Sequence, residues 1–198
     1  MKRYYSFLPA ILIVCSCLLT SCIPHEDTNQ SMALSGEWRG DFGMYYDYSY
    51  RGRTYTFDSY DSYVRFIPDY AYANHGVGTQ VDYYEEGPYE YQYYSFTWSV
   101  RNGVIYLYYD YDPGLDTRIS DYHMTNDYLR GTFSESGTQF RLYKMTDFYS
   151  WTPYVNTYGY GPRTGWYNGY PGTRAADAED AEAADSTGQV LSRGRRLN

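Results

Sequence analysis

Cysteine is scarce in this sequence and absent from most of it. The only three cysteines are Cys15, Cys17 and Cys22, so residues 23–198 contain none. That absence excludes disulfides, thiolate zinc sites and cysteine nucleophiles from all of the chain beyond Cys22.

Lysine is scarcer still, and basic residues as a whole are outnumbered by acidic ones. Beyond residue 21 there are fourteen Lys and Arg, of which only Lys144 is lysine, against 24 Asp and Glu. The net charge of this part is about −10, and no basic stripe is visible in the sequence. An acidic chain of this kind is a poor partner for nucleic acid or for anionic lipid head groups.

Sequence motifs for catalysis are missing as well. The chain has no Gly-x-Ser-x-Gly, no His-Glu-x-x-His and no phosphate-binding loop. We therefore expect no enzymatic activity and no cofactor. One calcium candidate remains, because Asp110, Asp112 and Asp116 place three carboxylates in one turn. A solvated turn is the alternative, since this segment lacks the glycine and the terminal glutamate of an EF-hand loop.

Long apolar runs are limited to one, near the start. Lys2 and Arg3 precede the run from Phe7 to Leu19, which is too short to span a membrane and has the form of a secretory signal, residues 1–21. The run ends in Leu19-Thr20-Ser21-Cys22, which resembles the lipobox of bacterial lipoproteins. The resemblance implies that Cys22 becomes the acylated N-terminus of the mature protein, with palmitate-type chains holding it in the membrane.

The residues after Cys22 favour the outer membrane. Ile23 stands where an aspartate would signal retention at the inner membrane in lipoproteins. Glu26-Asp27 is similar to export tags that send some lipoproteins to the cell surface, although a merely soluble linker is the alternative. Residues 22–34 are polar and without period, so we expect a lipid-anchored tether without fixed structure, on the periplasmic face or on the cell surface.

The period of the sequence becomes two after Gly36. From Trp38 to Tyr50 every second residue is apolar, aromatic or glycine, which is typical of a half-buried strand. Asn102-Gly103 is a favoured two-residue hairpin turn, and it predicts that Trp98 faces Leu107, Phe96 faces Tyr109 and Tyr94 faces Tyr111. A second turn, at residues 134–137, places Leu129 and Gly131 with Phe140 and Leu142 in the same way.

About eight strands with short connections follow one another between residues 35 and 147. This pattern predicts an all-β domain, an antiparallel meander that closes into a barrel. Residues 148–198 are first rich in Tyr, Gly and Pro and then acidic, so we expect a mostly disordered C-terminal tail, of which the first residues can dock on the barrel.

Tyrosine is what the chain has in excess. Between residues 36 and 147 there are 22 tyrosines against only 15 Leu, Ile, Val and Met. An aliphatic core of that size is small for the length, so tyrosine rings must supply much of the buried area. The outward-facing pair Tyr106 and Tyr108 is the part of this excess that remains a candidate working surface.

Gly36-Glu37-Trp38 at the head of the first strand is similar to the Gly-x-Trp signature of lipocalins, and the whole of residues 35–147 resembles the lipocalin-like domains of bacterial lipoproteins. The resemblance implies that Arg141, in the last strand, packs over Trp38. It also implies an inner face that is either a pocket lining or a solid core, made of Trp38, Phe42, Phe96, Trp98, Leu107, Tyr109, Phe140, Arg141 and Leu142.

Two functions are compatible with these patterns. The first is a non-enzymatic, lipid-anchored module whose barrel binds a small apolar or amphipathic ligand. The second is a structural or adhesive surface module whose exposed tyrosines contact glycans or proteins.

Overall fold

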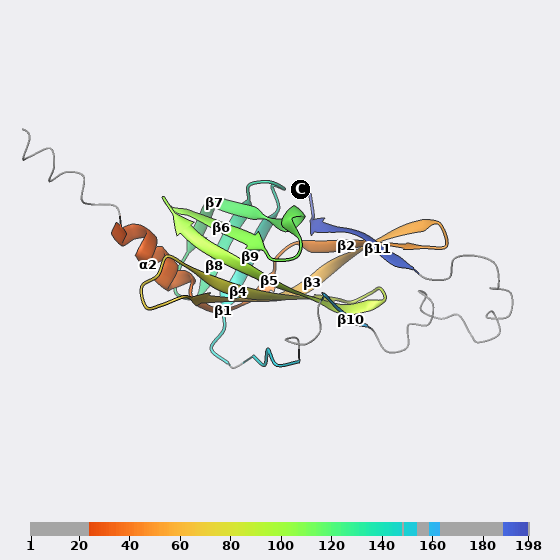
Figure 1. Ribbon diagram of the computed structural model, residues 1–198, viewed down its shortest axis with the longest axis horizontal. Coiled ribbons are helices and arrows are strands. Elements are labelled where there is room, and N and C mark those ends of the chain that lie inside the picture. Colours follow the sequence, from red (N-terminus) through yellow and green to blue (C-terminus); the bar gives the residue numbers. More distant parts are fainter. Residues whose placement is uncertain (1–23, 148, 154–158, 163–187, 198) are drawn as a thin grey trace, which may run out of the picture.

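The computed structural model describes residues 24–147, 149–153, 159–162 and 188–197, and Figure 1 gives its course. None of the described helices is long and apolar enough to cross a membrane. The elements in chain order are α2 (Pro24–Leu34), β1 (Gly36–Asp41), β2 (Met44–Tyr50), β3 (Arg53–Pro68), β4 (His75–Tyr84), β5 (Tyr89–Arg101), β6 (Val104–Tyr109), the short 3-10 helix η1 (Pro113–Leu115), β7 (Thr117–Met124), β8 (Tyr128–Phe133), β9 (Gln139–Lys144), β10 (Gly159–Pro162) and β11 (Gln189–Arg195).

Eight of the strands close into an antiparallel barrel, which confirms the predicted fold class. β3 to β9 follow one another as neighbours, and β1 completes the ring because it pairs with β9 on one side and with β3 on the other. Closure leaves these eight strands without an unpaired edge along the ring. The long strand β3 then continues past the barrel and pairs with β2, and β2 in turn pairs with β11.

The hairpin at Asn102-Gly103 has the predicted register. Trp98 pairs with Leu107 and Phe96 with Tyr109, and Asn102 and Gly103 both have positive φ, as the two-residue turn requires. The prediction for Tyr111 is wrong: β6 ends at Tyr109, and Tyr111 is 74% exposed in the loop that leads to η1. The chain turns away at Asp110 and Pro113, so the pairing of β5 with β6 ends at Phe96 and Tyr109 and does not reach Tyr94 and Tyr111.

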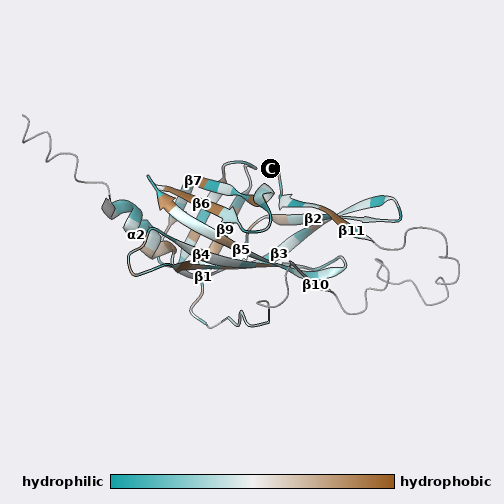
Figure 2. Ribbon diagram, viewed as in Figure 1, coloured by the Kyte–Doolittle hydropathy of each residue, from teal (hydrophilic) through white to brown (hydrophobic). Residues whose placement is uncertain are grey.

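The barrel interior is the main core. Its side chains form one cluster that takes inward residues from every barrel strand except β4, and Figure 2 shows the hydrophobic positions along these strands. Phe42, Phe133 and Phe140 meet edge-on or tilted with centroids 4.7–5.1 Å apart, and Phe66 packs against Phe96 and Trp98. Such geometries are favourable for aromatic pairs.

Beyond the barrel, tyrosines form a second core of their own. Tyr46, Tyr48, Tyr50 and Tyr84 are buried together between the extensions of β2, β3, β4 and β5, at the end of the molecule opposite α2 (Figure 1). Tyr46 and Tyr84 meet edge-on at 4.7 Å. The tyrosine excess is therefore used largely as packing material, as the small aliphatic core of the sequence suggested.

The strand predicted from Gly36 to Tyr50 is broken in the middle. β1 ends at Asp41 and β2 begins at Met44, and Gly43 between them has a φ of +71°. A Cβ at Gly43 would lie 2.5 Å from the Thr138 side chain, so the turn needs glycine for its dihedral and for space. This break moves the chain from the barrel into the tyrosine-packed extension.

The expectation of an unstructured tether is wrong for residues 24–34, which form the helix α2 and close one end of the barrel. Leu34 is fully buried, the Trp38 indole N–H donates to the Leu34 carbonyl at 2.7 Å, and the Lys144 ammonium donates to the Ala33 carbonyl at 2.8 Å. These two donors satisfy carbonyls that the last turn of a helix leaves without partners. At the other end of α2, the Asp27 carboxylate accepts the backbone N–H groups of Asn102 and Gly103, each at 2.8 Å.

The expectation of a mostly disordered tail is wrong for β10 and β11, whereas Trp151 docks on the barrel as expected of the first residues of the tail. β10 pairs with β5, and β11 pairs with β2. Trp151 is buried against β1 and β3, where its indole N–H donates to Glu37 at 2.7 Å and its ring lies 4.8 Å from the Arg65 guanidinium. Residues 148, 154–158, 163–187 and 198, which that expectation also covers, lie outside the described residues.

Candidate functional site

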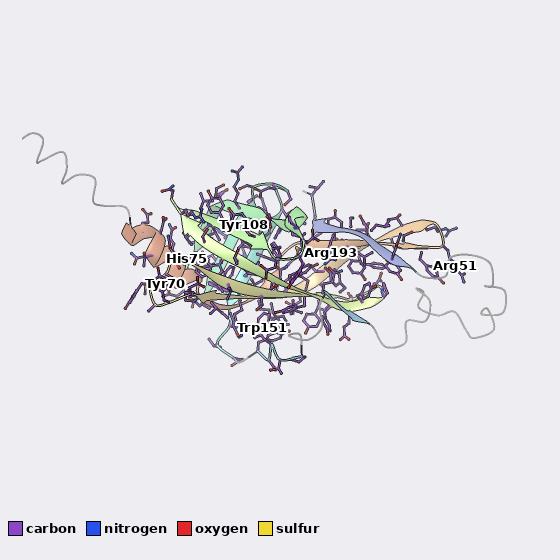
Figure 3. The ribbon with its side chains drawn as sticks, in the orientation of Figure 1. Arg51, Tyr70, His75, Tyr108, Trp151 and Arg193 are labelled. Carbon is purple, nitrogen blue, oxygen red and sulfur yellow. The ribbon has the colours of Figure 1, made fainter. Side chains whose placement is uncertain are left out.

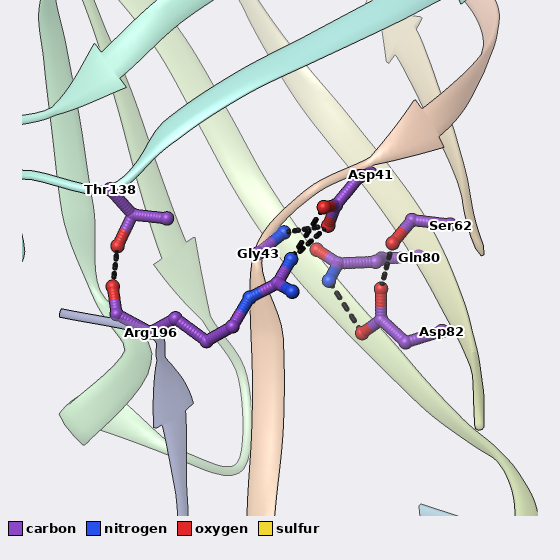
Figure 4. A network of polar contacts seen from close by, with 7 residues as sticks. All are labelled: Asp41, Gly43, Ser62, Gln80, Asp82, Thr138 and Arg196. Atoms are coloured by element: carbon purple, nitrogen blue, oxygen red, sulfur yellow. Dashed lines mark hydrogen bonds and ion pairs between the residues drawn. The ribbon is translucent and has the colours of Figure 1, made fainter. Parts of the chain in front are cut away.

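A chain of polar side chains crosses the barrel interior between the aromatic clusters. Ser62 and Gln80 donate to the two oxygens of Asp82, at 2.6 and 2.7 Å, and Figure 4 shows these contacts. The Tyr109 hydroxyl donates to Gln80 at 2.6 Å, and the Arg195 guanidinium donates to the Tyr109 oxygen at 2.8 Å. A single hydrogen-bonded path thus links a carboxyl on β4 to a guanidinium on β11.

The carboxyl at one end of this path titrates near neutrality. Asp82 is fully buried, and burial raises its pKa to about 7, against the hydrogen bonds from Ser62 and Gln80 and the charge of Arg195, which lower it. Burial also raises the pKa of the Tyr109 hydroxyl to about 12, so that group stays protonated and can donate to Gln80.

The guanidinium at the other end fills the interior where β11 meets the barrel. Arg195 is only 8% exposed, and its guanidinium carbon lies 4.2 Å from the Phe133 ring centroid, 5.3 Å from Tyr109 and 5.9 Å from Phe42. It also donates to the Leu115 carbonyl at 2.7 Å. Cation–π contact and hydrogen bonding together compensate the burial of this charge.

Most of the inner-face residues expected from the sequence do face inward. Eight of them are at most 5% exposed and belong to the one barrel cluster: Trp38, Phe42, Phe96, Trp98, Leu107, Tyr109, Phe140 and Leu142. In this structure they pack against one another, so they act as a core.

Arg141 is the exception, and the role implied for it is wrong. It lies on the outward face of β9, exposed, while its neighbours Phe140 and Leu142 point in. The cation that packs over Trp38 is Lys144, with its ammonium 4.9 Å from the ring centroid, because Lys144 is the ladder partner of Trp38. The alternation along β9 already separates Arg141 from the inner face.

The calcium candidate is not supported by the structure. Within the described residues, no group of three His, Cys, Asp or Glu side chains could hold a metal ion. Asp116 accepts the Tyr109 backbone N–H at 2.7 Å, and Asp112 lies 3.4 Å from the Arg193 guanidinium. These carboxylates order the turn between β6 and β7.

On the outside of the barrel, β7, β8 and β9 carry an open hollow of about 590 Å³. Arg130 and Arg141 stand directly opposite each other across β8 and β9, and His123 on β7 is the ladder partner of Arg130. The hollow is lined by Asp41, Asp121, Tyr122, His123, Arg130, Gly131, Thr132, Gln139, Phe140 and Arg141.

A second hollow, of about 370 Å³, lies farther along β9 and β1. Arg39, Asp61 and Tyr143 are among its lining residues. The Arg39 guanidinium is paired with the Asp61 carboxylate at 2.8 Å. Tyr143 is 54% exposed and stands two residues from Arg141 on the same outward face of β9, so it lies between the two hollows.

The outward pair Tyr106 and Tyr108 is arranged as the register predicts. Their rings are stacked with centroids 6.3 Å apart and an interplanar angle of 9°. Tyr108, which is labelled in Figure 3, is 43% exposed. The Arg101 guanidinium lies 5.8 Å from the Tyr106 ring.

Sequence reasoning missed the outer hollow and the interior path. Arg130, His123 and Arg141 are separated by 7 to 18 positions in the sequence, and only the register of β7, β8 and β9 brings them into one row. Asp82 and Gln80 did give a signal, since they are polar residues at alternating positions in a strand with Val81 between them. Arg195 gave none, because it lies in a segment of tail composition.

Comparisons with known proteins add little. No protein-family model and no curated protein matches this chain. Among solved structures, the chain is similar to a lipocalin-like protein from Bacteroides uniformis, with 15% sequence identity and a TM-score of 0.35 over 57% of this chain and 99% of the other.

Proposed function

We propose that this chain is a non-enzymatic binding module of the outer membrane, anchored through acylated Cys22, that holds its ligand on the outside of the barrel. One observation carries the proposal. The inward apolar residues of the barrel pack against one another, and the Arg195 guanidinium lies against three of their rings, while an open hollow of about 590 Å³ lined by both charged and neutral polar groups lies on the outward face of β7 to β9. Of the two functions considered from the sequence, this favours the surface module that contacts glycans or proteins.

The geometry of α2 supports anchoring at one defined end. Ile23 alone separates Cys22 from the first residue of the helix, so the acyl chains would start within about 7 Å of Pro24. Met32, Tyr70 and Tyr72 at this end are 49%, 62% and 69% exposed, and Figure 3 shows Tyr70 beside α2. Exposed tyrosines of this kind suit the interface of a bilayer. The β2–β3 turn would then point away from the membrane.

The binding surface can be tested with a panel of neutral and acidic oligosaccharides and the full acylated protein in detergent. We expect retention of at least one saccharide class, and weaker retention by Tyr143→Ala, which removes the exposed ring between the two hollows. Tyr108→Ala, on the outward face of β6, is the matched control and should bind as the native protein does. A protein that retains no member of the panel contradicts the proposal.

A second candidate function, an apolar ligand inside the barrel, is favoured by one observation. Arg195 is carried on β11, which pairs with β2 alone among the described strands. Release of β11 would expose the rings of Phe42, Tyr109 and Phe133 that now surround the guanidinium. If this function is the true one, Arg195→Ala binds an apolar fluorescent dye much more tightly than the native protein, and the dye competes with the natural ligand.

A further inference from the structure

Three basic side chains form one row across the outer hollow. His123 on β7, Arg130 on β8 and Arg141 on β9 are consecutive ladder partners, and all three are exposed. Leu129 and Leu142, next to the two arginines along their strands, are buried in the barrel. The row therefore faces outward, away from the core.

The facing positions of Arg130 and Arg141 do not stabilise the fold. Like charges directly opposite each other on antiparallel strands destabilise the sheet. Within the part of the chain that the structure describes, neither Arg130 nor Arg141 has an ion pair. Arg39 and Arg118, also on outward faces of barrel strands, are each paired with a carboxylate. The opposed pair is thus left for a group that the chain itself does not supply.

The nearest carboxylate in the row is already committed. Asp41 is the ladder partner of Arg141, but both of its oxygens accept hydrogen bonds from the Arg196 guanidinium at 2.5 Å, and one also accepts the Gly43 backbone N–H (Figure 4). With Asp41 neutralised by Arg196, the two guanidinium groups of Arg130 and Arg141 face only the Asp121 carboxylate, so the hollow keeps one net positive charge although the protein as a whole is acidic. An anion is the complementary ligand.

The rest of the hollow carries groups that suit hydroxyls. Asp121 offers acceptor oxygens, Gln139 offers an amide that both donates and accepts, and Thr132 offers a hydroxyl. The exposed ring of Tyr143 stands beside Arg141 on the same face. An aromatic ring next to a set of donors and acceptors suits a sugar, which has an apolar face and a rim of hydroxyls.

We infer that the opposed pair Arg130 and Arg141 is the subsite for the carboxylate or sulfate of an acidic oligosaccharide, whose neighbouring sugars lie along β9 toward Tyr143. This inference deepens the proposed function and rests on it. Guanidinium groups bind such planar or tetrahedral oxyanions through two parallel N–H···O bonds, which fixes the orientation of the bound group. The hollow is then the place where one acidic residue of a longer polymer is held.

The test measures the affinity of the full acylated protein in detergent for an oligogalacturonate and for a neutral oligosaccharide of the same length. We expect the acidic one to bind more tightly, and Arg130→Gln or Arg141→Gln to weaken it about tenfold, the value of one charge-assisted contact. The double glutamine variant should lose the preference for the acidic ligand. Arg53→Gln, which removes the same charge near the β2–β3 turn, is the matched control and should leave the affinity unchanged.

Two further readouts separate a built site from general charge attraction. The double variant Arg130→Lys with Arg141→Lys keeps the charge but loses the guanidinium fork, so its affinity should also fall several-fold. The glutamine variants should melt at or above the temperature of the native protein, since the opposed charges are removed, which shows that lost binding is not lost folding.

Several results would overturn the inference. They are an unchanged affinity of the double glutamine variant for the acidic oligosaccharide, an equal loss of affinity in Arg53→Gln, and full affinity in the double lysine variant. A further such result is that acetate or sulfate alone inhibits binding as completely as the oligosaccharide does at the same concentration. Equal binding of the neutral and acidic sugars overturns the subsite and leaves the proposed function standing. Binding of neither sugar counts against both.

Discussion

At the scale of single residues, Asp82 is a carboxyl that is fully buried in the barrel interior. Burial raises its pKa to about 7, because the carboxylate form loses more solvation than Ser62, Gln80 and Arg195 return. A carboxyl whose pKa is raised on folding binds its proton more tightly in the folded state. Its contribution to stability is therefore complete below the unfolded pKa near 4 and is lost as the pH rises through about 7.

We expect the free energy of unfolding to decrease between pH 4 and pH 7 by an amount on the order of 4 kcal/mol from this group, the equivalent of the change in its pKa. Asp82→Asn cannot ionise, so its unfolding free energy should lack this decrease. Denaturant titrations at several pH values measure it, with substitution of the exposed Asp58 by Asn as a control that keeps Asp82. The same slope in Asp82→Asn and in the native protein would show that another group is responsible.

Arg141 shows how a resemblance in sequence can assign the wrong role to a residue. Resemblance to lipocalins places an arginine of the last strand over Trp38, but the alternation along β9 sends Arg141 outward and brings Lys144 to the tryptophan. Lys144, which is the only lysine beyond residue 21, thus contacts both the Trp38 ring and the end of α2. A lysine suits this position, because its slender side chain can bring the ammonium to a helix carbonyl beside an indole ring.

At the scale of elements, α2 is a helix that its own sequence hardly encodes. Its residues are polar and show no helical period of apolar side chains, and among residues 26–34, whose burial is described, only Ser31 and Leu34 are fully buried. The helix is held by hydrogen bonds to distant parts of the chain: to Asn102 and Gly103 in the β5–β6 turn, to Ala73 in the β3–β4 loop and to Tyr122 on β7. A pattern read along the chain cannot contain such contacts.

We expect Asp27→Ala to loosen α2 from the β5–β6 turn, because the N–H groups of Asn102 and Gly103 lose their acceptor. The cost should be about 1 to 2 kcal/mol of unfolding free energy, with faster hydrogen exchange at these two amides. Glu26→Ala is the matched control, since Glu26 shares the position at the helix start but accepts no bond from the turn. Equal effects of the two substitutions would assign the role of Asp27 to the helix dipole alone.

The barrel hairpins were predictable, whereas β11 was not. Asn102-Gly103 determines both the turn type and the register, so every pair from Phe96 to Tyr109 follows from local sequence. β11 has the composition of a tail, and its pairing with β2 bridges about 140 positions of the chain. The outer hollow could not be predicted from the sequence either, because it depends on the combined register of three strands.

We expect Arg195→Ala to be among the most destabilising substitutions in β11, by about 3 kcal/mol, because it empties a buried site and leaves Tyr109 and the Leu115 carbonyl without a donor. Arg195→Met, which keeps most of the volume and removes the buried charge, should cost less. Arg193→Met on the same strand is the control. Equal costs for Arg195→Ala and Arg193→Met would contradict a structural role for the buried guanidinium.

At the scale of the whole molecule, the two ends of the protein differ, and the proposed binding surface lies on one side between them. α2 and the exposed Met32, Tyr70 and Tyr72 lie at the end nearest Cys22, while the tyrosine-packed extension forms the far end (Figure 1). The outer hollow lies on the side of the barrel between them, on β7 to β9. Anchored through Cys22, the barrel would stand with this side open to molecules beside the membrane.

Native mass spectrometry of the protein, extracted in mild detergent from the membrane fraction of the cells that make it, tests this account most directly. We expect a chain that begins at Cys22 and carries acyl groups there, with no apolar ligand retained, and with added acidic oligosaccharide bound in a one-to-one complex. A chain without acylation at Cys22, or an apolar ligand that remains bound and excludes nothing from the outer hollow, would contradict it.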